Sequence, residues 1–248
     1  MTESSPVVAG GREVTLHTGP LGSTIHVLRA DAATIAELAA VDWNRAFRRV
    51  CLDPVSGLIV LMTPSRLHED LSEILGDIVD IAASTLRGAV RGLRTSRLRE
   101  PGAPPGTGME PDCAFYVGEN ARAYREALKE GDDAAEAFFE RTPPDLVVEV
   151  EITSAARGKI ARYADLGVPE LWLFRPRDGK DDDPELDFLA LRPRADPRPL
   201  AVSNVLGTLT PADVRDAMNG MRLSLTHDER AEAVARIVHR RQRKCSCS

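Results

Sequence analysis

The stretch PDLVVEVE, residues 144–151, decides the fold of this chain. Its apolar run is typical of a β-strand in a protein core. Because side chains alternate between the two faces of a strand, Val147, Glu149 and Glu151 lie on one face. Two carboxylates on a core strand are costly to desolvate unless a proton, a cationic side chain or a metal ion compensates. The stretch therefore predicts a core strand that carries an acidic pair in need of a partner.

The bulk composition limits the class of protein. The chain has 248 residues, of which 43% are hydrophobic, and a net charge of −6. These values indicate a soluble protein with one large domain or one domain with additions, and they argue against a surface that coats nucleic acid, although they allow a local basic groove. No apolar run has transmembrane length and the N-terminus lacks the pattern of a signal peptide, so we expect a cytoplasmic protein without a membrane partner. The cysteines fit neither a disulfide framework nor a zinc signature; they are Cys51, Cys113, Cys245 and Cys247.

The segments around the acidic strand alternate between strand and helix. A strand over 112–117 follows the Pro- and Gly-rich loop 101–109. An acidic, alanine-rich helical segment over 119–140 separates this strand from the next as an insertion or a lid. A helix over 154–166 then leads into a strand over 170–174. This order predicts a mixed sheet flanked by helices.

The outer parts of the chain carry weaker signals. We expect disorder over 1–12, two short strands within 13–30, a helix over 32–50, a strand over 58–62, a helix over 65–93, a charged turn over 178–184, strands over 186–192 and 199–206, and a helix from the capping box of Thr226 and Glu229 to about residue 243. The chain then divides into three parts. These are an N-terminal extension over 1–49, partly disordered, with strands and a helix; a main domain over 50–225; and a C-terminal helix with a basic tail over 226–248.

Further candidate residues lie on the predicted helices. Lys159 follows the acidic strand, and Tyr163 lies about 40° from it around a helix, so the lysine shares a stripe with an aromatic residue and leans toward the protein body. On the long helix, His68 lies near the buried arc, whereas Glu69 and Glu73 lie outside it.

The combination of Asp112, Glu149, Glu151 and Lys159 suits metal-assisted hydrolysis of phosphodiesters. Carboxylates bind Mg²⁺ or Mn²⁺, and the metal lowers the pKa of a bound water and neutralises charge in the transition state. A lysine can orient that water or stabilise phosphate charge.

The same residues resemble a known family. Asp112 followed by an acid-x-acid strand resembles the PD-(D/E)XK nuclease motif. PDLVVEV, then Lys159 and Tyr163, then GVPELWLF is similar to the Uma-two (Uma2) family of restriction endonucleases, and TPSRLHEDLSEIL over 63–75 resembles that family's helix entry with its histidine. The similarity spans about 50–225.

The resemblance implies an α/β restriction-endonuclease-like fold, a mixed β-sheet flanked by helices, with N-terminal and C-terminal helical additions. It implies Asp112 and Glu149 as metal ligands and Lys159 as the catalytic lysine of an enzyme that hydrolyses DNA; Glu151 is a possible third ligand, and His68 and Tyr163 are possible accessory residues. Many nucleases of the superfamily act as dimers, which makes a homodimer possible here. Two features depart from the pattern: Glu151 stands where the plain motif has its lysine, and 152–154 replace the family's Ser-Pro-Ser.

Plainer interpretations stand beside these. Asp112 could cap a strand, Glu149 could pair with a buried arginine, Glu151 could be solvated, and Lys159 could extend its amine into solvent across Tyr163. His68 could be a satisfied helix-edge histidine, and Tyr163 and Trp172 core residues. The whole protein could be a catalytically inactive nuclease-fold protein that binds nucleic acid or a protein partner, or a different metal-dependent hydrolase. Two basic runs could follow a phosphate backbone or be solvated ends; they comprise Arg87, Arg91, Arg94, Arg97 and Arg99, and Arg236, Arg240, Arg241, Arg243 and Lys244.

Overall fold

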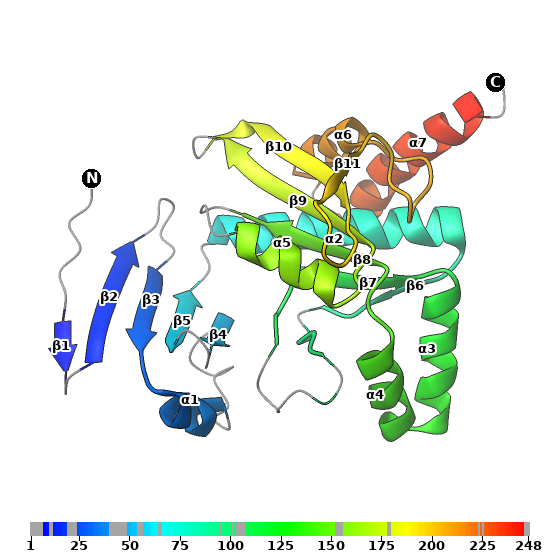
Figure 1. Cartoon of the computed structure of the whole chain (residues 1–248). Helices are drawn as coiled ribbons and strands as arrows, with labels where there is room; N and C mark the ends of the chain where they lie inside the picture. The colour runs from blue at the N-terminus through cyan, green and yellow to red at the C-terminus, as the bar shows by residue number, and fades with distance from the viewer. Residues whose placement is uncertain are drawn as a thin grey trace. The chain divides into compact units, whose positions relative to one another are not determined.

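The computed structural model describes most of the chain (Figure 1). The described residues are 7–9, 12–18, 24–39, 49–53, 57–63, 66–94, 96–100, 102, 108–151, 156–177, 180–222, 224 and 226–245. The contacts divide the chain into two compact units. Unit one comprises residues 1–69 and 97–110, and unit two comprises 70–96 and 111–248. The three-part division at residues 49 and 225 stays a prediction.

Unit one is built on a five-stranded antiparallel sheet in the order β1-β2-β3-β5-β4. Its elements are β1 (Val7–Ala9), β2 (Arg12–Thr18), β3 (Thr24–Arg29), α1 (Ala32–Ala39), β4 (Arg49–Asp53) and β5 (Leu58–Thr63). Ile35 of α1 and Ile59 of β5 are buried together, with Leu28, Leu38 and Leu52 packed against them. A small apolar cluster therefore joins the helix to its sheet.

Two expectations for unit one were wrong. The helix predicted over 32–50 ends its described part at Ala39, and Arg49 and Val50 belong to β4, which pairs antiparallel with β5. β-branched and apolar residues in this run pair well across a sheet, and that tertiary pairing overrides the helical pattern. Residues 1–12, expected to be disordered, contain β1, which pairs with β2.

Unit two is built on a six-stranded mixed sheet in the order β11-β10-β9-β8-β7-β6. Its strands are β6 (Val90–Gly92), β7 (Cys113–Val117), β8 (Leu146–Val150), β9 (Glu170–Arg177), β10 (Lys180–Ala190) and β11 (Arg198–Leu200). β8 and β9 pair in parallel, and the other neighbours pair antiparallel. Parallel neighbours need a crossover, which α5 (Ala156–Asp165) provides.

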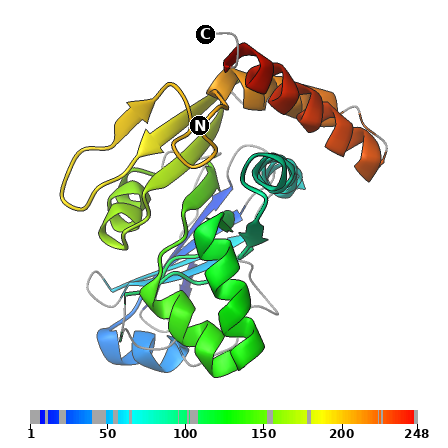
Figure 2. The same ribbon diagram turned by 90° about the vertical axis from the view of Figure 1, so that its right-hand side faces the viewer.

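The register assigns the residues of β8 to two layers. Cys113 of β7 lies opposite Val148, so the two side chains share a face of the sheet. Cys113 donates a weak hydrogen bond to the carbonyl of Ser72 in α2 (Arg66–Arg87), at 3.4 Å, so this face is covered by α2. Figure 2 shows α2 and α5 on opposite sides of the sheet. The face of β8 that carries Glu149 is therefore the face toward α5.

The acidic segment after β7 folds as a helical hairpin of α3 (Glu119–Glu130) and α4 (Asp132–Arg141). The break falls at Gly131, whose φ of 129° lies in a region that L residues avoid. Rings of Tyr124 and Phe138 pack on Tyr116 of β7 with centroids 5.3 and 5.5 Å away. An aromatic cluster thus attaches the hairpin to the sheet.

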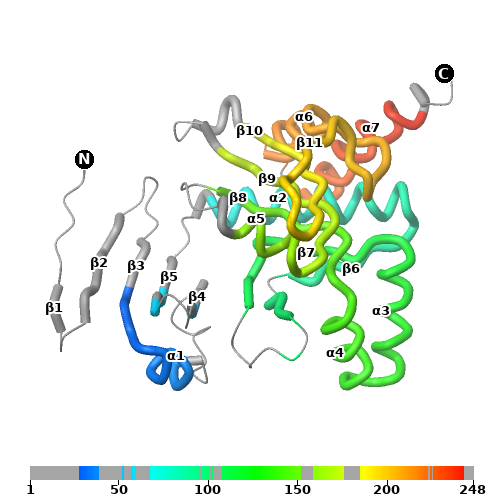
Figure 3. The backbone as a smooth tube through the Cα atoms, viewed as in Figure 1, coloured from blue at the N-terminus to red at the C-terminus, as the bar shows by residue number. Residues whose placement is uncertain are grey.

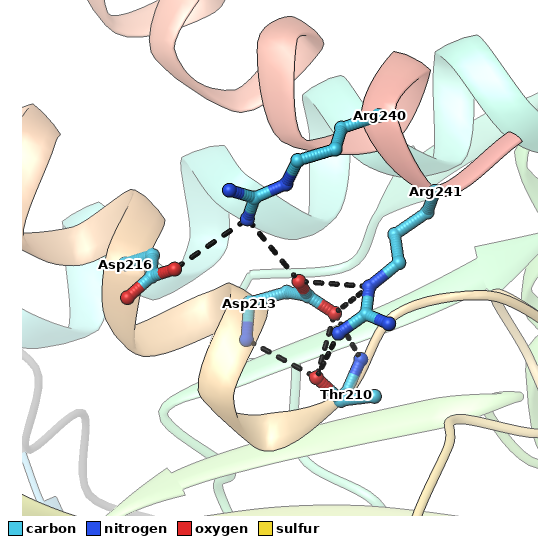
Figure 4. A network of polar contacts seen from close by, with 5 residues as sticks. All are labelled: Thr210, Asp213, Asp216, Arg240 and Arg241. Carbon is cyan, nitrogen blue, oxygen red and sulfur yellow. Dashed lines mark hydrogen bonds and ion pairs between the residues drawn. The ribbon is translucent and has the colours of Figure 1, made fainter. Parts of the chain in front are cut away.

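The chain ends in two helices, α6 (Pro211–Arg222) and α7 (His227–Cys245). Thr210 caps α6 as its hydroxyl accepts from the Asp213 N–H at 3.2 Å, while the Asp213 carboxylate accepts from the Thr210 N–H at 2.9 Å. Arg241 of α7 donates to both oxygens of that same carboxylate, at 2.9 and 2.7 Å (Figure 4). One buried aspartate therefore both starts α6 and holds α7.

Several boundaries in unit two differ from expectation. α2 ends at Arg87 and the chain reverses at Gly88, with φ 65°, so the predicted helix 65–93 contains β6 at its end. Residues 180–184, expected as a turn, belong to β10, and of the strand expected over 199–206 only Pro199 and Leu200 are extended, as part of β11, which pairs with β10 (Figure 3). Helix α6 was not predicted, although Thr210 followed by Pro211 and Asp213 is a helix-start signal. None of the described helices has the length and apolar character needed to cross a bilayer.

Candidate active site

The candidate site centres on Glu149, which is 4% exposed in the middle of the sheet. Lys159 Nζ donates a hydrogen bond to Glu149 Oε2 at 2.7 Å. The Tyr163 hydroxyl donates a short hydrogen bond to Glu149 Oε1. Each oxygen of the buried carboxylate thus has a donor from α5.

The crossover geometry explains this arrangement. Lys159 and Tyr163 are separated by one helical turn, so they lie on the same face of α5. Tyr163 is completely buried, whereas the Lys159 side chain is 36% exposed. The face of α5 that packs on the sheet therefore presents a buried phenol and a partly solvated ammonium to Glu149. The sequence predicted that Lys159 leans toward the protein body, and its contact with Glu149 agrees with this prediction.

Asp112 lies directly beside this cluster. It is 7% exposed and its Oδ2 accepts a hydrogen bond from the Val150 N–H at 2.6 Å. Since Cys113 pairs with Val148 in the antiparallel ladder, Asp112 stands at the end of β7 next to the Glu149–Val150 peptide. The two strands thereby bring together two acidic residues that are 37 positions apart in the sequence.

Glu151 takes part in a second polar group. Its N–H continues the ladder by donating to the Phe174 carbonyl at 2.7 Å. Its carboxylate lies 4.0 Å from Arg175 Nε, and Arg175 also contacts Asp187 at 2.5 Å and Glu185 at 3.9 Å. Glu151 is therefore part of an ion-pair group on β8, β9 and β10, adjacent to Glu149.

His68 is buried, with Nδ1 3.7 Å from the Glu69 carboxylate. It belongs to unit one, whereas Asp112, Glu149 and Lys159 belong to unit two. An accessory role of His68 stays a prediction.

The donor chemistry fits a hard divalent cation. Asp112 and Glu149 supply carboxylate oxygens, the ligands that Mg²⁺ prefers, and Mg²⁺ commonly uses one or two carboxylates and keeps several waters. Within the described part of the chain, no three His, Cys, Asp or Glu side chains gather in a group able to hold a metal. Asp112 and Glu149 could supply two of the ligands of such a cation, which would leave further positions for water and substrate.

Several arginines of the two basic runs contact other residues of the protein, although Arg87, Arg91 and Arg240 remain exposed. Arg87 Nε donates to the Val205 carbonyl at 2.8 Å, and Arg97 pairs with Glu110. The Arg91 guanidinium lies 6.0 Å from the Tyr124 ring centroid. In the C-terminal run, Arg240 and Arg241 bind Asp213. These contacts give five of the arginines partners within the protein; whether the runs follow a phosphate backbone or are solvated ends stays open.

Arg175 was not among the site residues predicted from the sequence, although it belongs to the same ion-pair group as Glu151. It shares a face with Glu149, because Glu149 pairs with Leu173 and residues two apart on a strand face the same way. Only the parallel register of β8 with β9 reveals this, and a register is not readable from one strand's own sequence.

The comparison with protein families identifies the class of protein. The model of the family Uma2, described as "Putative restriction endonuclease", matches residues 42–180, more than half of the chain. The chain belongs to the Uma2 family, and its mixed six-stranded sheet with flanking helices is a restriction-endonuclease-like α/β fold. The match includes the whole of β7, β8 and α5, which position the cluster. No curated protein matches the chain.

Proposed function

We propose that this protein is a divalent-metal-dependent endonuclease that hydrolyses phosphodiester bonds of DNA. The observation that carries the proposal is the buried Glu149 carboxylate, bonded by Lys159 and Tyr163 and adjacent to Asp112. A buried carboxylate and its ion pair are costly to desolvate, and apolar side chains of similar size would stabilise the sheet core equally well. The presence of these polar groups therefore favours a functional role. Membership of the Uma2 family supports the reaction class.

Each residue has a proposed role. Asp112 and Glu149 hold Mg²⁺ or Mn²⁺, which would supply an activated water and charge neutralisation when bound. Lys159 Nζ, partly solvated at the edge of the cluster, orients the attacking water or stabilises phosphate charge. Tyr163 keeps the Glu149 carboxylate in a fixed orientation.

The proposed role of Glu151 is different from a direct ligand. Its proposed role is to support the position of the Arg175 guanidinium, which lies 4.0 Å from the Glu151 carboxylate. Participation as a third metal ligand is the alternative. A loss of Mn²⁺ affinity in Glu151→Gln as large as that in Glu149→Gln would establish it.

A nuclease assay tests the proposal. The full chain is incubated with supercoiled plasmid and Mg²⁺ or Mn²⁺, beside Asp112→Asn, Glu149→Gln and Lys159→Ala. Each substitution is expected to lower the cleavage rate on the order of 100-fold, as removal of a charge-stabilising group does in other enzymes. The exposed Arg162 on the same helix supplies the control variant Arg162→Met, expected to cleave as the wild type does. Cleavage that survives in Asp112→Asn and Lys159→Ala would contradict the assignment.

The alternative, a nuclease-fold protein that binds DNA or a protein without cleaving, gives a different outcome. The wild type would then retain a DNA mobility shift with no product at any metal concentration.

We also propose a homodimer, since an endonuclease that cuts both strands can use two symmetric sites. Light scattering checks this against the chain mass of 27.0 kDa.

A further inference from the structure

The two oxygens of Glu149 have different partners, and this difference points to a property of the site beyond its reaction. Tyr163 Oη is completely buried with its ring in the core, so it can hardly leave Glu149 Oε1. Lys159 is a flexible side chain that is 36% exposed, so its ammonium can move from Oε2 into solvent without disturbing the core packing. One oxygen is held permanently, and the other is held by a side chain that can move.

We propose that Lys159 is an exchangeable internal counter-ion, which occupies Glu149 Oε2 until a divalent cation takes its place. This inference rests on the proposed function. In the cation-free protein, the ammonium neutralises a carboxylate that is 4% exposed and would otherwise be a buried, uncompensated charge. When a cation is bound, Lys159 releases Oε2, and its amine becomes available for the substrate.

The contacts of the site show which groups stay in place during this exchange. Tyr163 keeps Oε1 and the carboxylate plane in place while Oε2 changes its partner. Asp112 is anchored independently by the Val150 N–H, so its position does not depend on Lys159. The lysine and the cation therefore compete for one oxygen atom of a fixed site. Competition predicts that removing the ammonium tightens cation binding while it removes catalysis.

Mn²⁺ binding without DNA measures the competition. Free Mn²⁺ is followed by electron paramagnetic resonance during titration of the full-length wild type, Lys159→Met, Lys159→Gln, Lys159→Arg and Glu149→Gln. The two neutral variants are expected to bind Mn²⁺ about threefold to fivefold more tightly, the upper part of the range for loss of a partly exposed ion pair. Lys159→Arg should bind as the wild type does, and Glu149→Gln should lose binding. Arg162→Met removes one positive charge from the same helix outside the cluster, and its affinity should stay within twofold of the wild type.

A second measurement uses the wild type alone. Lys129, Lys159, Lys180 and Lys244 are the lysines of the chain, so acetylation by acetic anhydride can be followed at each by mass spectrometry. Saturating Mn²⁺ should raise the acetylation rate of Lys159 several-fold. Lys129 forms an ion pair of similar length with Glu126, at 2.8 Å on an exposed face of α3, and is the internal control whose rate should not change.

The outcomes separate this inference from the proposed function. Unchanged or weaker Mn²⁺ binding by both neutral variants, or an unchanged Lys159 acetylation rate, overturns the exchange but leaves a metal-dependent nuclease intact. Absence of Mn²⁺ binding in every variant overturns the exchange and the metal site together. Tighter binding in the neutral variants, combined with their loss of cleavage, supports both.

Discussion

At the residue scale, the contacts of Glu149 explain why a carboxylate is tolerated in a sheet core. A buried charge is costly unless it is paired and hydrogen-bonded, and Lys159 and Tyr163 meet both requirements. Glu170 obeys the same rule at the start of β9. It is 1% exposed and accepts hydrogen bonds from the Trp172 indole, the Ser203 hydroxyl and the Asn204 N–H, which fixes the loop after β11. Such loop contacts give Glu170 a structural role, whereas one donor to Glu149 is a lysine that is partly solvated.

Tyr163→Phe tests the strength of the buried contact. The change removes one hydroxyl and keeps the ring, so Glu149 Oε1 loses its donor, and the free energy of unfolding should fall by about 1–3 kcal/mol. Urea denaturation measures it. In a Glu149→Gln background the same change should cost less, since the unsatisfied acceptor no longer carries a charge. Tyr124→Phe, in the α3–α4 aromatic cluster, is the matched control and should cost under about 1 kcal/mol. Equal costs for both tyrosines would contradict a special role of the Tyr163 hydroxyl.

At the element scale, the start of α6 and the position of α7 depend on one carboxylate. Asp213 closes the capping box with Thr210 and binds Arg241, while Arg240 bridges from it at 3.6 Å to Asp216 at 3.5 Å (Figure 4). Burial acts to raise the pKa of Asp213, but hydrogen bonds from Arg241 and Thr210 outweigh it and hold that pKa below its usual range. This carboxyl therefore links the stability of the C-terminal helices to pH.

The sign of the pH effect follows from the lowered pKa. In the unfolded chain Asp213 titrates near the ordinary value of about 3.9, and in the folded chain it titrates lower. Its stabilisation is therefore fully present above about pH 5 and is lost as the pH falls through the folded-state pKa. Asp213→Asn should lower the free energy of unfolding by about 1–3 kcal/mol at pH 7, and the difference from the wild type should shrink below about pH 4. Urea titrations at several pH values measure this. Asp216 is exposed on the same helix, so Asp216→Asn should unfold with nearly the free energy of the wild type at every pH. If the difference in the free energy of unfolding between Asp213→Asn and the wild type is as large at pH 3 as at pH 7, the linkage is refuted.

The α3–α4 hairpin depends on one backbone conformation. At Gly131 the φ of 129° is open to glycine, and no atom lies within 4 Å of an added Cβ, so Gly131→Ala isolates the backbone cost. We expect a loss of about 1–2 kcal/mol in the free energy of unfolding. Differential scanning calorimetry measures this loss. The comparison variant is Ala127→Gly within α3, whose lower helix propensity should cost about 1 kcal/mol. A stabilising effect of Gly131→Ala would show that the break does not need glycine.

At the scale of the whole molecule, a bound cation should stabilise the folded chain by mass action. If Asp112 and Glu149 hold Mg²⁺ or Mn²⁺, a concentration near 100 times the dissociation constant adds about 2.7 kcal/mol to the free energy of unfolding. Thermal unfolding with increasing Mn²⁺ should therefore show a rising Tm in the wild type. Glu149→Gln should show no such rise in Tm. The baseline Tm is measured in a buffer that contains EDTA and no divalent metal. A flat Tm in the wild type at millimolar Mn²⁺ would count against the metal site.

Much of the architecture could be predicted because its signals are local. The β8 run, the β5 run, the α5 helix and the Thr226 capping box, where Glu229 N–H donates to the Thr226 hydroxyl at 3.2 Å, all lie where their patterns placed them. The ends of α1 and α2 could not be predicted, because their last turns were replaced by strands that exist only through pairing with distant partners. Strand propensity depends on context in this way far more than helix propensity does.

The sequence by itself determined that Glu149 lies on a core strand and that Lys159 and Tyr163 share a helix face, because periodicities of two and 3.6 residues are local properties of the backbone. It also determined the family, through motifs that keep their order along the chain. Only the tertiary structure decided which oxygen of Glu149 each side chain binds, that Asp112 bonds the Val150 N–H, and that Glu151 lies beside Arg175. These contacts follow from the crossover of α5 and the register of three strands, and a register relates residues that no local pattern connects.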